Sequence, residues 1–274
     1  MKESFFIQQF KNRYIGDDGA VLNICAKNSV IASDSFFENI HFKREWMKLD
    51  EISYKASLVN ISDMIVMNSK IDYAVLNVGF PNTLTLAEIK LLAEGFKKAA
   101  NEYGYKIIGG DTIKSDNISI SVTMIGKSRR PVFRKAKIGE FVAFTGNLGS
   151  VAKDLKILLR GGNVSKRSKF IKPVLRDKFF YKVSKYITAA CDISDGLFKE
   201  LERISEVSYV NYKFLKKFDK NIGCSGEEYE ILFTFPKKNL KIINNIAKIT
   251  RTPVNIFAVT TRGKYKSICK ENHF

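Results

Sequence analysis

Features that mark several common protein classes are missing from this 274-residue chain. No apolar run approaches the ~20 residues of a transmembrane helix, and the N-terminal MKESFFIQQFKNRY becomes charged too early for a signal peptide. The four cysteines lie far apart without a CxxC, so we expect free thiols, and with only two histidines a zinc site is disfavoured. We therefore expect a cytoplasmic protein with no membrane partner.

The familiar nucleotide-binding signatures are missing as well. The chain contains no GxxxxGK[ST], no GxGxxG after a strand and no HRDxxxxN kinase loop. Any ATP site in this chain must therefore belong to another family of folds.

Positive charge is what the chain has in excess. Its 46 Lys and Arg against 28 Asp and Glu give a formal net charge of +18. Such a balance suits nucleic acid, an anionic membrane surface or phosphorylated small molecules. It also suits the codon bias of an AT-rich genome, because Lys, Ile, Asn and Phe are abundant together. The basic residues are scattered, and the densest stretch, 160–178, is typical of a solvated loop leading into a helix.

The order of apolar patterns predicts two mixed α/β domains, which suits a chain of this length. RRPVFRKAKIGE has no apolar periodicity, so we place the boundary near residue 135, with domains over 1–135 and 136–274. The expected strands are 20–25, 29–33, 72–80, 105–110, 118–126, 141–146, 229–235 and 254–261. The expected helices are 50–67, 84–104 (closed by Gly104), one from about 151, 173–186, 196–205 and 237–249.

The acidic residues share a local context despite the basic composition. Most lie beside Gly or Ser, and several directly follow an apolar run. Taken alone, the pair in AACDISDGL could simply cap a helix. If strand and helix ends converge on one crevice, however, so many carboxylates would need cations, and Mg²⁺ prefers such oxygen ligands. The residues concerned are Asp17, Asp18, Asp34, Asp63, Asp111, Asp192, Asp195, Glu227 and Glu228.

Glycines beside these acids suggest close approach of a ligand. In KIIGGDT, Gly109 and Gly110 would let the backbone come near a bound molecule. TGNLGS leads into a helix N-terminus, which can hold phosphate, but an ordinary strand-to-helix turn explains it equally well.

Seven motifs in order carry a resemblance to a known family. They are IGDDGAV, SDSFFENIHF, KASLVNISDM, IIGGDT, FTGNLGS, DISDGL and SGEEYEILF, and they span about residues 15–235. This set resembles bacterial thiamine-monophosphate kinase, a family of the aminoimidazole ribonucleotide synthetase superfamily. The resemblance implies that ATP phosphorylates thiamine monophosphate to thiamine diphosphate. It also implies a two-domain fold and a homodimer formed through the N-terminal sheets.

The resemblance also implies roles for individual residues. Arg134, Asp192 and Asp195 would be catalytic, and His41 and Glu227 would face the thiamine substrate, although His41 alone would pass for a structural histidine. Several Mg²⁺ ions would be held by Asp18, Ser33, Asp34, Asp63, Asp111, Asp192 and Asp195. ATP would contact Tyr103, Gly110, Asp111, Arg134 and Ser194.

The chain departs from the family pattern at four positions. Asn68 replaces a usual Gly, Glu228 replaces the Asp of GEDYE, and Ser33 replaces a common Thr. Glu271 replaces a C-terminal aromatic that would stack on the substrate ring. Specific recognition of the thiamine ring is therefore the least secure property to carry over from the family.

Two other functions remain open at this point. One is an ATP-dependent synthetase of the same superfamily, whose acids and fold would look alike. The other is a basic nucleic-acid-binding protein, which should show clustered basic residues with interleaved aromatics.

Overall fold

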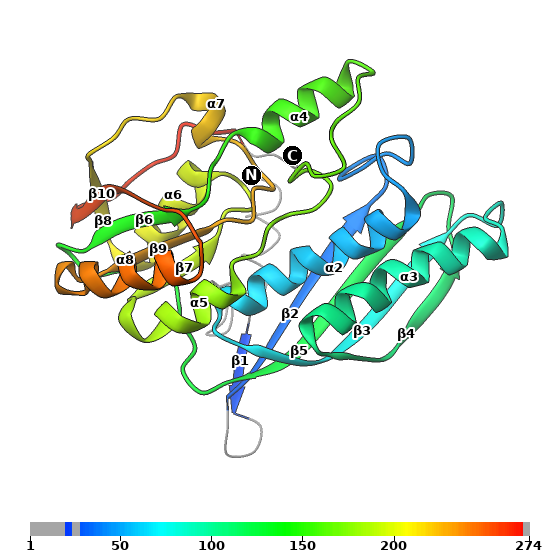
Figure 1. Cartoon of the computed structure of the whole chain (residues 1–274), viewed down its shortest axis with the longest axis horizontal. Coiled ribbons are helices and arrows are strands. Elements are labelled where there is room, and N and C mark those ends of the chain that lie inside the picture. Colours follow the sequence, from blue (N-terminus) through cyan, green and yellow to red (C-terminus); the bar gives the residue numbers. More distant parts are fainter. Residues whose placement is uncertain (1–19, 24–27, 271–274) are drawn as a thin grey trace.

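The fold contains two five-stranded sheets with helices packed between and around them, in a mixed α/β arrangement (Figure 1). The computed structural model describes residues 20–23 and 28–270. Asp17, Asp18 and Glu271 lie outside these residues. The predicted boundary at residue 135 falls between the last strand of the first sheet and the first strand of the second, and it stays a prediction.

The first sheet has the order β1-β2-β5-β3-β4. All neighbours are antiparallel except β3 and β4, which are parallel because α3 connects them. The period-two pattern around residues 118–126 works as predicted, since Ile120, Val122 and Met124 are buried on one face. The strands are β1 (Ala20–Asn23), β2 (Asn28–Phe37), β3 (Lys70–Phe80), β4 (Lys106–Lys114) and β5 (Ser119–Ser128).

Helices α2 (Leu49–Val66) and α3 (Leu86–Tyr103) cover the same face of this sheet (Figure 1). Helix α3 starts at a capping box of Thr85 and Glu88 and ends at Gly104 in the left-handed conformation, as its sequence predicts. Helix α2 is buried along most of its length, because it packs on the sheet, on α3 and on elements of the second half. Helix α2 therefore joins the two halves.

The second sheet has the order β7-β9-β6-β10-β8, and all its pairs are antiparallel. Its strands are β6 (Phe141–Thr145), β7 (Ala189–Asp192), β8 (Val210–Phe214), β9 (Ile231–Phe235) and β10 (Val254–Arg262). Its helices are α4 (Ser150–Leu159), α5 (Asp177–Val183), η1 (Ser184–Tyr186), α6 (Leu197–Ser208), α7 (Lys220–Gly223), η2 (Lys237–Asn239) and α8 (Leu240–Ile249). The sequence did not predict β7, β8 or α7, and the helix predicted over 173–186 is shorter.

The prediction that all cysteines are free thiols is wrong for one pair. Cys224 and Cys269 form a disulfide that ties the C-terminal segment to the end of α7. Cys191 is a buried free thiol, and Cys25 lies outside the described residues.

Candidate functional site

Four carboxylates from both halves of the chain lie near enough to one buried tyrosine for their charges to act on it. They are Asp34, Asp63, Asp192 and Glu227, and we call them the acidic cluster. Burial first, and then the negative charge of these four groups, raises the pKa of Tyr229 well above its ordinary value. The structure therefore brings four of the predicted positions near one tyrosine, and their proposed roles stay predictions.

Asp34 and Asp63 meet between β2 and α2. Asp34 lies on the helix-covered face of β2, and its carboxyl contacts that of Asp63 near the end of α2. Desolvation raises the pKa of Asp34, while the hydrogen bond with Asp63 acts in the opposite direction. The Oδ2 atom of Asp34 is buried and has no hydrogen-bond partner among the described residues. Two acids this close, with one oxygen unused, form a site that suits a cation.

Asp192 brings the second sheet to the same place. It is the last residue of β7 and is almost fully buried. Ser62, next to Asp63 on α2, donates a hydrogen bond of 2.6 Å from Oγ to Oδ2 of Asp192. The end of a second-half strand is thereby fixed against a first-half helix.

The SGEEYE segment completes the acidic cluster through an unusual backbone. Glu227 and Tyr229 have φ values of 54° and 48°, a left-handed conformation that is costly for non-glycine residues. The Glu227 amide donates to the Ser194 carbonyl at 2.6 Å, and the Tyr229 amide donates to the Ile193 carbonyl at 3.0 Å. The predicted substrate motif and the DISDGL motif are therefore locked together.

His41 lies in the turn that follows β2. Its Nδ1 accepts a hydrogen bond from the Phe37 amide at 3.0 Å, so the neutral imidazole carries its proton on Nε2. Its ring also lies 5.3 Å from that of Phe36. An imidazole in this tautomer has its donor on Nε2, and the role of His41 at the thiamine substrate stays a prediction.

Asp195 and Arg134 belong to a separate charge network. Asp195 pairs with Arg203 at 2.5 Å, Arg203 pairs with Glu200 at 2.6 Å, and Arg134 lies 3.9 Å from Glu200. Burial raises the pKa of Glu200, while the two arginines act in the opposite direction. Gly196 is the N-cap residue of α6, so neither acid of DISDGL caps that helix with its side chain.

Ser33 and Asp111 lie on the other face of the first sheet. Strand alternation turns Ser33 away from α2, where its Oγ is 2.8 Å from Oγ1 of Thr123. Asp111 is exposed on the edge strand β4, in the same row as Asn77 and Ser121. The structure therefore does not bring these two predicted ligands into the acidic cluster within one chain.

The remaining predicted nucleotide contacts are spread out. Tyr103 lies at the end of α3, where burial first and then Glu102 and Asp177 raise its pKa. Gly110 has a φ of 147°, and a Cβ there would lie 1.6 Å from the Leu76 carbonyl oxygen, so only glycine fits this pairing of β3 and β4.

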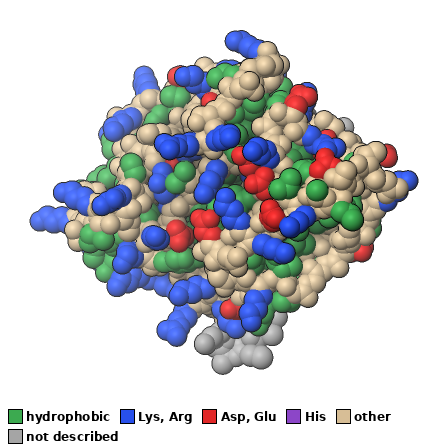
Figure 2. Space-filling view, turned by 45° about the vertical axis from the view of Figure 1, so that its right-hand side comes forward, with side chains coloured by type: hydrophobic (Ala, Val, Ile, Leu, Met, Phe, Trp, Pro, Cys, Tyr) green, Lys and Arg blue, Asp and Glu red, His purple; other side chains and the backbone are tan. Residues whose placement is uncertain are grey.

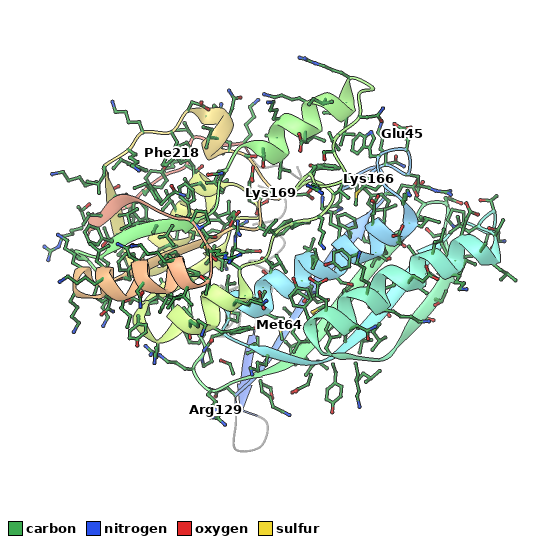
Figure 3. The ribbon with its side chains drawn as sticks, in the orientation of Figure 1. Glu45, Met64, Arg129, Lys166, Lys169 and Phe218 are labelled. Atoms are coloured by element: carbon green, nitrogen blue, oxygen red, sulfur yellow. A yellow bond between two sulfur atoms is a disulfide. The ribbon has the colours of Figure 1, made fainter. Side chains whose placement is uncertain are left out.

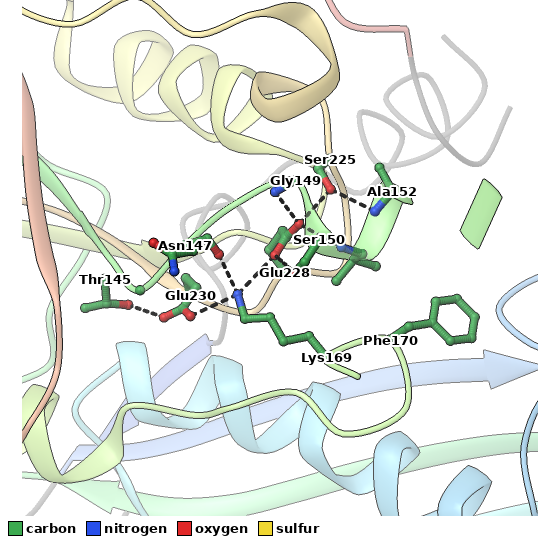
Figure 4. A network of polar contacts seen from close by, with 12 residues as sticks. Thr145, Asn147, Gly149, Ser150, Ala152, Lys169, Phe170, Ser225, Glu228 and Glu230 are labelled. Carbon is green, nitrogen blue, oxygen red and sulfur yellow. Dashed lines mark hydrogen bonds and ion pairs between the residues drawn. The ribbon is translucent and has the colours of Figure 1, made fainter. Parts of the chain in front are cut away.

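The TGNLGS turn is already occupied by a carboxylate of the chain (Figure 4). Glu228 accepts hydrogen bonds from the amides of Gly149 and Val151, at 2.7 and 3.2 Å, at the N-terminus of α4. Lys169 pairs with both Glu228 (3.0 Å) and Glu230 (2.9 Å). The geometry therefore favours the strand-to-helix turn over the phosphate site.

Glu230 is as fully satisfied as Glu228. Thr145 donates to it at 2.7 Å, and Arg176 donates from Nε and Nη2 at 2.9 Å each. Glu228, Glu230, Lys169 and Arg176 form what we call the paired cluster. The Glu228 that departs from the family pattern is therefore a structural residue here.

The metal prediction stays a prediction. Across 20–23 and 28–270, no group of three His, Cys, Asp or Glu side chains is arranged to hold a metal ion. The contact between Asp34 and Asp63, the unused Asp34 oxygen and the nearby Asp192 are nevertheless the donor chemistry that Mg²⁺ prefers. The further predicted ligand Asp18 lies outside the described residues.

The sequence analysis missed several charged residues that shape the site. Lys55, on α2, is fully buried and pairs with Glu227 at 2.7 Å. Glu200 and Arg203 are spaced three apart on α6, a spacing that signals an ion pair. Lys55 stands inside KASLVNISDM, but no local pattern reveals its distant partner.

Comparisons with known proteins show which family this chain resembles. Residues 16–128 match the family model of the AIR synthase related protein, N-terminal domain. The chain is 31% identical over 261 residues to thiamine-monophosphate kinase of Pyrococcus horikoshii, covering 88% of this chain and 84% of the relative. It is 33% identical over 287 residues to thiamine-monophosphate kinase of Bacillus subtilis, covering 93% and 88%.

The fold likeness extends over nearly the whole chain. The solved structure "AaThiL complexed with AMPPCP and TMP" matches with a TM-score of 0.87 at 24% identity, covering 98% of this chain and 94% of that one. Within the described residues, no helix is both long enough and apolar enough to cross a bilayer. On its sequence relatives, and in agreement with its fold, the chain belongs to the thiamine-monophosphate kinase family.

Proposed function

We propose that this chain transfers the γ-phosphoryl group of ATP to thiamine monophosphate, forming thiamine diphosphate and ADP. The observation that carries the proposal is the acidic cluster, in which carboxylates from both halves of a family member meet between β2, α2 and β7. Thiamine-monophosphate kinases among the relatives supply the reaction class.

Phosphoryl transfer to a phosphate acceptor depends on how the two substrates are positioned more than on a strong general base. The acceptor is a phosphate monoester that is already largely ionised near neutral pH, so no residue needs to remove a proton from it. The obstacle is the repulsion between two polyanions, which positioned cations and donors must offset. We expect direct in-line transfer, with Asp192, Asp195 and Arg134 as the catalytic residues.

Several Mg²⁺ ions belong to this proposal. Bound ions would neutralise charge on the phosphates and hold them in line. Asp34, Asp63 and Asp192 would hold them within the described residues, and Asp18, Ser33, Asp111 and Asp195 are further proposed ligands.

The substrate and nucleotide contacts are proposals at named positions. His41 would donate from Nε2 to a phosphate oxygen, and Glu227 would face the thiamine part of the substrate. Arg134 would lie against the ATP phosphates. Tyr103, Gly110, Asp111 and Ser194 would contact the nucleotide.

We also propose a homodimer in the cytoplasm, formed through the first sheet. Among the described residues, helices cover only one face of this sheet, and the apolar side chains of Tyr73 and Ile113 are exposed on the other face. An open apolar face of this kind suits a partner subunit. Light scattering coupled to size-exclusion chromatography should give twice the chain mass.

The decisive experiment is incubation with ATP, Mg²⁺ and thiamine monophosphate, read by chromatography. We expect stoichiometric thiamine diphosphate and ADP, and neither without Mg²⁺. ATP consumption without thiamine diphosphate would contradict the proposal and favour a synthetase of the same superfamily. Figure 2 shows Lys and Arg side chains spread over the visible face rather than in one patch, which does not favour nucleic-acid binding.

A further inference from the structure

One lysine connects the first half of the chain to the predicted substrate carboxylate. Lys55 lies in the middle of α2, and its side chain has no exposed surface. Its Nζ is 2.7 Å from Oε2 of Glu227, although the two residues are 172 positions apart. The contact therefore spans the two halves at the edge of the acidic cluster.

The ammonium group of Lys55 is held in place by two aromatic rings as well as by Glu227. Nζ lies over the ring of Phe170 at 4.3 Å and over the ring of Phe36 at 5.4 Å, so two aromatic faces share the cation with Glu227. Burying an ammonium group is costly, and a fully buried lysine is rare unless it is paired. Helix α2 could have packed here with an apolar side chain.

Glu227 is held from its backbone side as well. Its left-handed backbone and its amide bond to Ser194 fix the Cα position, and Lys55 takes one carboxylate oxygen. The Glu227 side chain keeps 22% of its surface exposed, so a bound molecule can reach part of it. Phe36, under Lys55, also contacts the ring of His41, the other predicted substrate residue.

We propose that Lys55 is a positioning residue that aims the Glu227 carboxylate at the thiamine substrate from across the domain interface. This proposal rests on the proposed function. Lys55 does not touch the substrate in this scheme, and it acts by fixing which oxygen of Glu227 faces outward. A lysine with a merely structural role would affect folding, and any loss of activity would fall equally on both substrates.

The test compares Lys55→Met with Lys172→Met. Lys172 also places its cation over an aromatic residue of α2, Tyr54 at 5.2 Å, but its side chain is exposed, whereas that of Lys55 is buried. We expect Lys55→Met to raise the KM for thiamine monophosphate about tenfold or more while the KM for ATP changes little. Lys172→Met should leave both constants near wild type.

Further variants separate positioning from folding. Lys55→Arg keeps the charge and should recover most of the thiamine monophosphate affinity, and Lys55→Met/Glu227→Gln should be no weaker than Glu227→Gln alone. If Lys55→Met does not fold, Lys55→Gln replaces it and should show the same selective rise. Calorimetric titration with thiamine monophosphate gives an independent affinity.

The outcomes distinguish this proposal from the proposed function. Equal rises in both KM values, or an unchanged thiamine monophosphate affinity in a folded Lys55 variant, would overturn the positioning role. A wild-type protein that forms no thiamine diphosphate would instead overturn the proposed function.

Discussion

Two groups of buried acids lie side by side in this protein, and adjacent residues of one loop belong to different groups. Glu228 belongs to the paired cluster, where Lys169 and the α4 amides neutralise it. Glu227 belongs to the acidic cluster. Lys55 pairs with Glu227, but Asp34 and Asp63 contact each other, and all four charges act on Tyr229. Figure 3 shows Lys169 between the C-terminal elements and α2.

The difference shows what each group is built for. A buried carboxylate that the chain itself satisfies contributes to a fixed structure, and removing its partner leaves an uncompensated charge. A carboxylate held against another carboxylate costs stability until a cation arrives, and such arrangements are typical of functional sites. Acid count alone would not separate the two groups, whereas the partners of Asp34 and Asp63, which contact each other, differ from the cations that pair with Glu228 and Glu230.

The largest expected effect is on turnover, from the acidic cluster. Asp192→Asn or Asp63→Asn should lower kcat for thiamine diphosphate formation by at least about 100-fold, because each would lose a charged ligand for Mg²⁺. The half-buried Asp72, which pairs with the exposed Lys127 at 3.1 Å, gives the control Asp72→Asn, which should stay near wild type. If Asp192→Asn or Asp63→Asn kept full activity, the acidic cluster would have no catalytic role that sets it apart from the paired cluster.

The second effect is on stability, from the paired cluster. Lys169→Met should lower the free energy of unfolding by about 3 kcal/mol, because Glu228 and Glu230 lose their shared cation. Urea denaturation measures this loss. Lys166→Met, on an exposed position of the same loop, should change stability by less than about 0.5 kcal/mol. A stable Lys169→Met would mean that the pairing contributes little.

A smaller loss of stability should follow from crowding Glu230. Gly146 has a φ of 60°, and a Cβ there would lie 1.9 Å from Oε1 of Glu230. Gly146→Ala should therefore destabilise the protein by about 1–3 kcal/mol, through both the strained backbone and the displaced carboxylate. Thermal unfolding with and without Mg²⁺ should show the same loss, because this site holds no proposed metal ligand.

The smallest expected effect is a gain in stability, when Asp34 of the acidic cluster is replaced. Desolvation raises the pKa of Asp34, so between its ordinary value and the raised one the folded state binds more protons than the unfolded state. In chelator, wild-type stability should therefore fall as pH rises through that window, and Asp34→Asn should lack this slope. At neutral pH Asp34→Asn should have a larger free energy of unfolding than wild type. Below the ordinary aspartate pKa the two free energies should converge. Identical pH profiles in urea titrations would contradict this account.

Local periodicity explains what the sequence could predict of the fold. Helix α3 has a capping box, a buried stripe and a terminal glycine, and β5 alternates strictly, so both are clear in the sequence. Strand β7 is buried at all four residues and shows no alternation, so its sequence looks like a junction before α6. Asn68 departs from a usual glycine without penalty, since its φ of 54° is one that asparagine tolerates.

The site was predictable only in part, because local periodicity does not show which distant residues meet. The motif order identified which acids matter, but their partners come from distant elements. Lys55 meets Glu227, and Ser62 meets Asp192 over 130 positions. Whether Glu228 is free or neutralised depends on Lys169, in a loop whose sequence shows no pattern.

The Cys224–Cys269 bond closes a loop that contains the SGEEYE segment, β9, α8 and β10. A protease that nicks the backbone once between these cysteines would not release a fragment. The two pieces would run together on a non-reducing gel and separate only after a thiol reductant is added. The same covalent link means that removing Cys269 by truncation would leave Cys224 as an unpaired thiol directly before the predicted substrate motif.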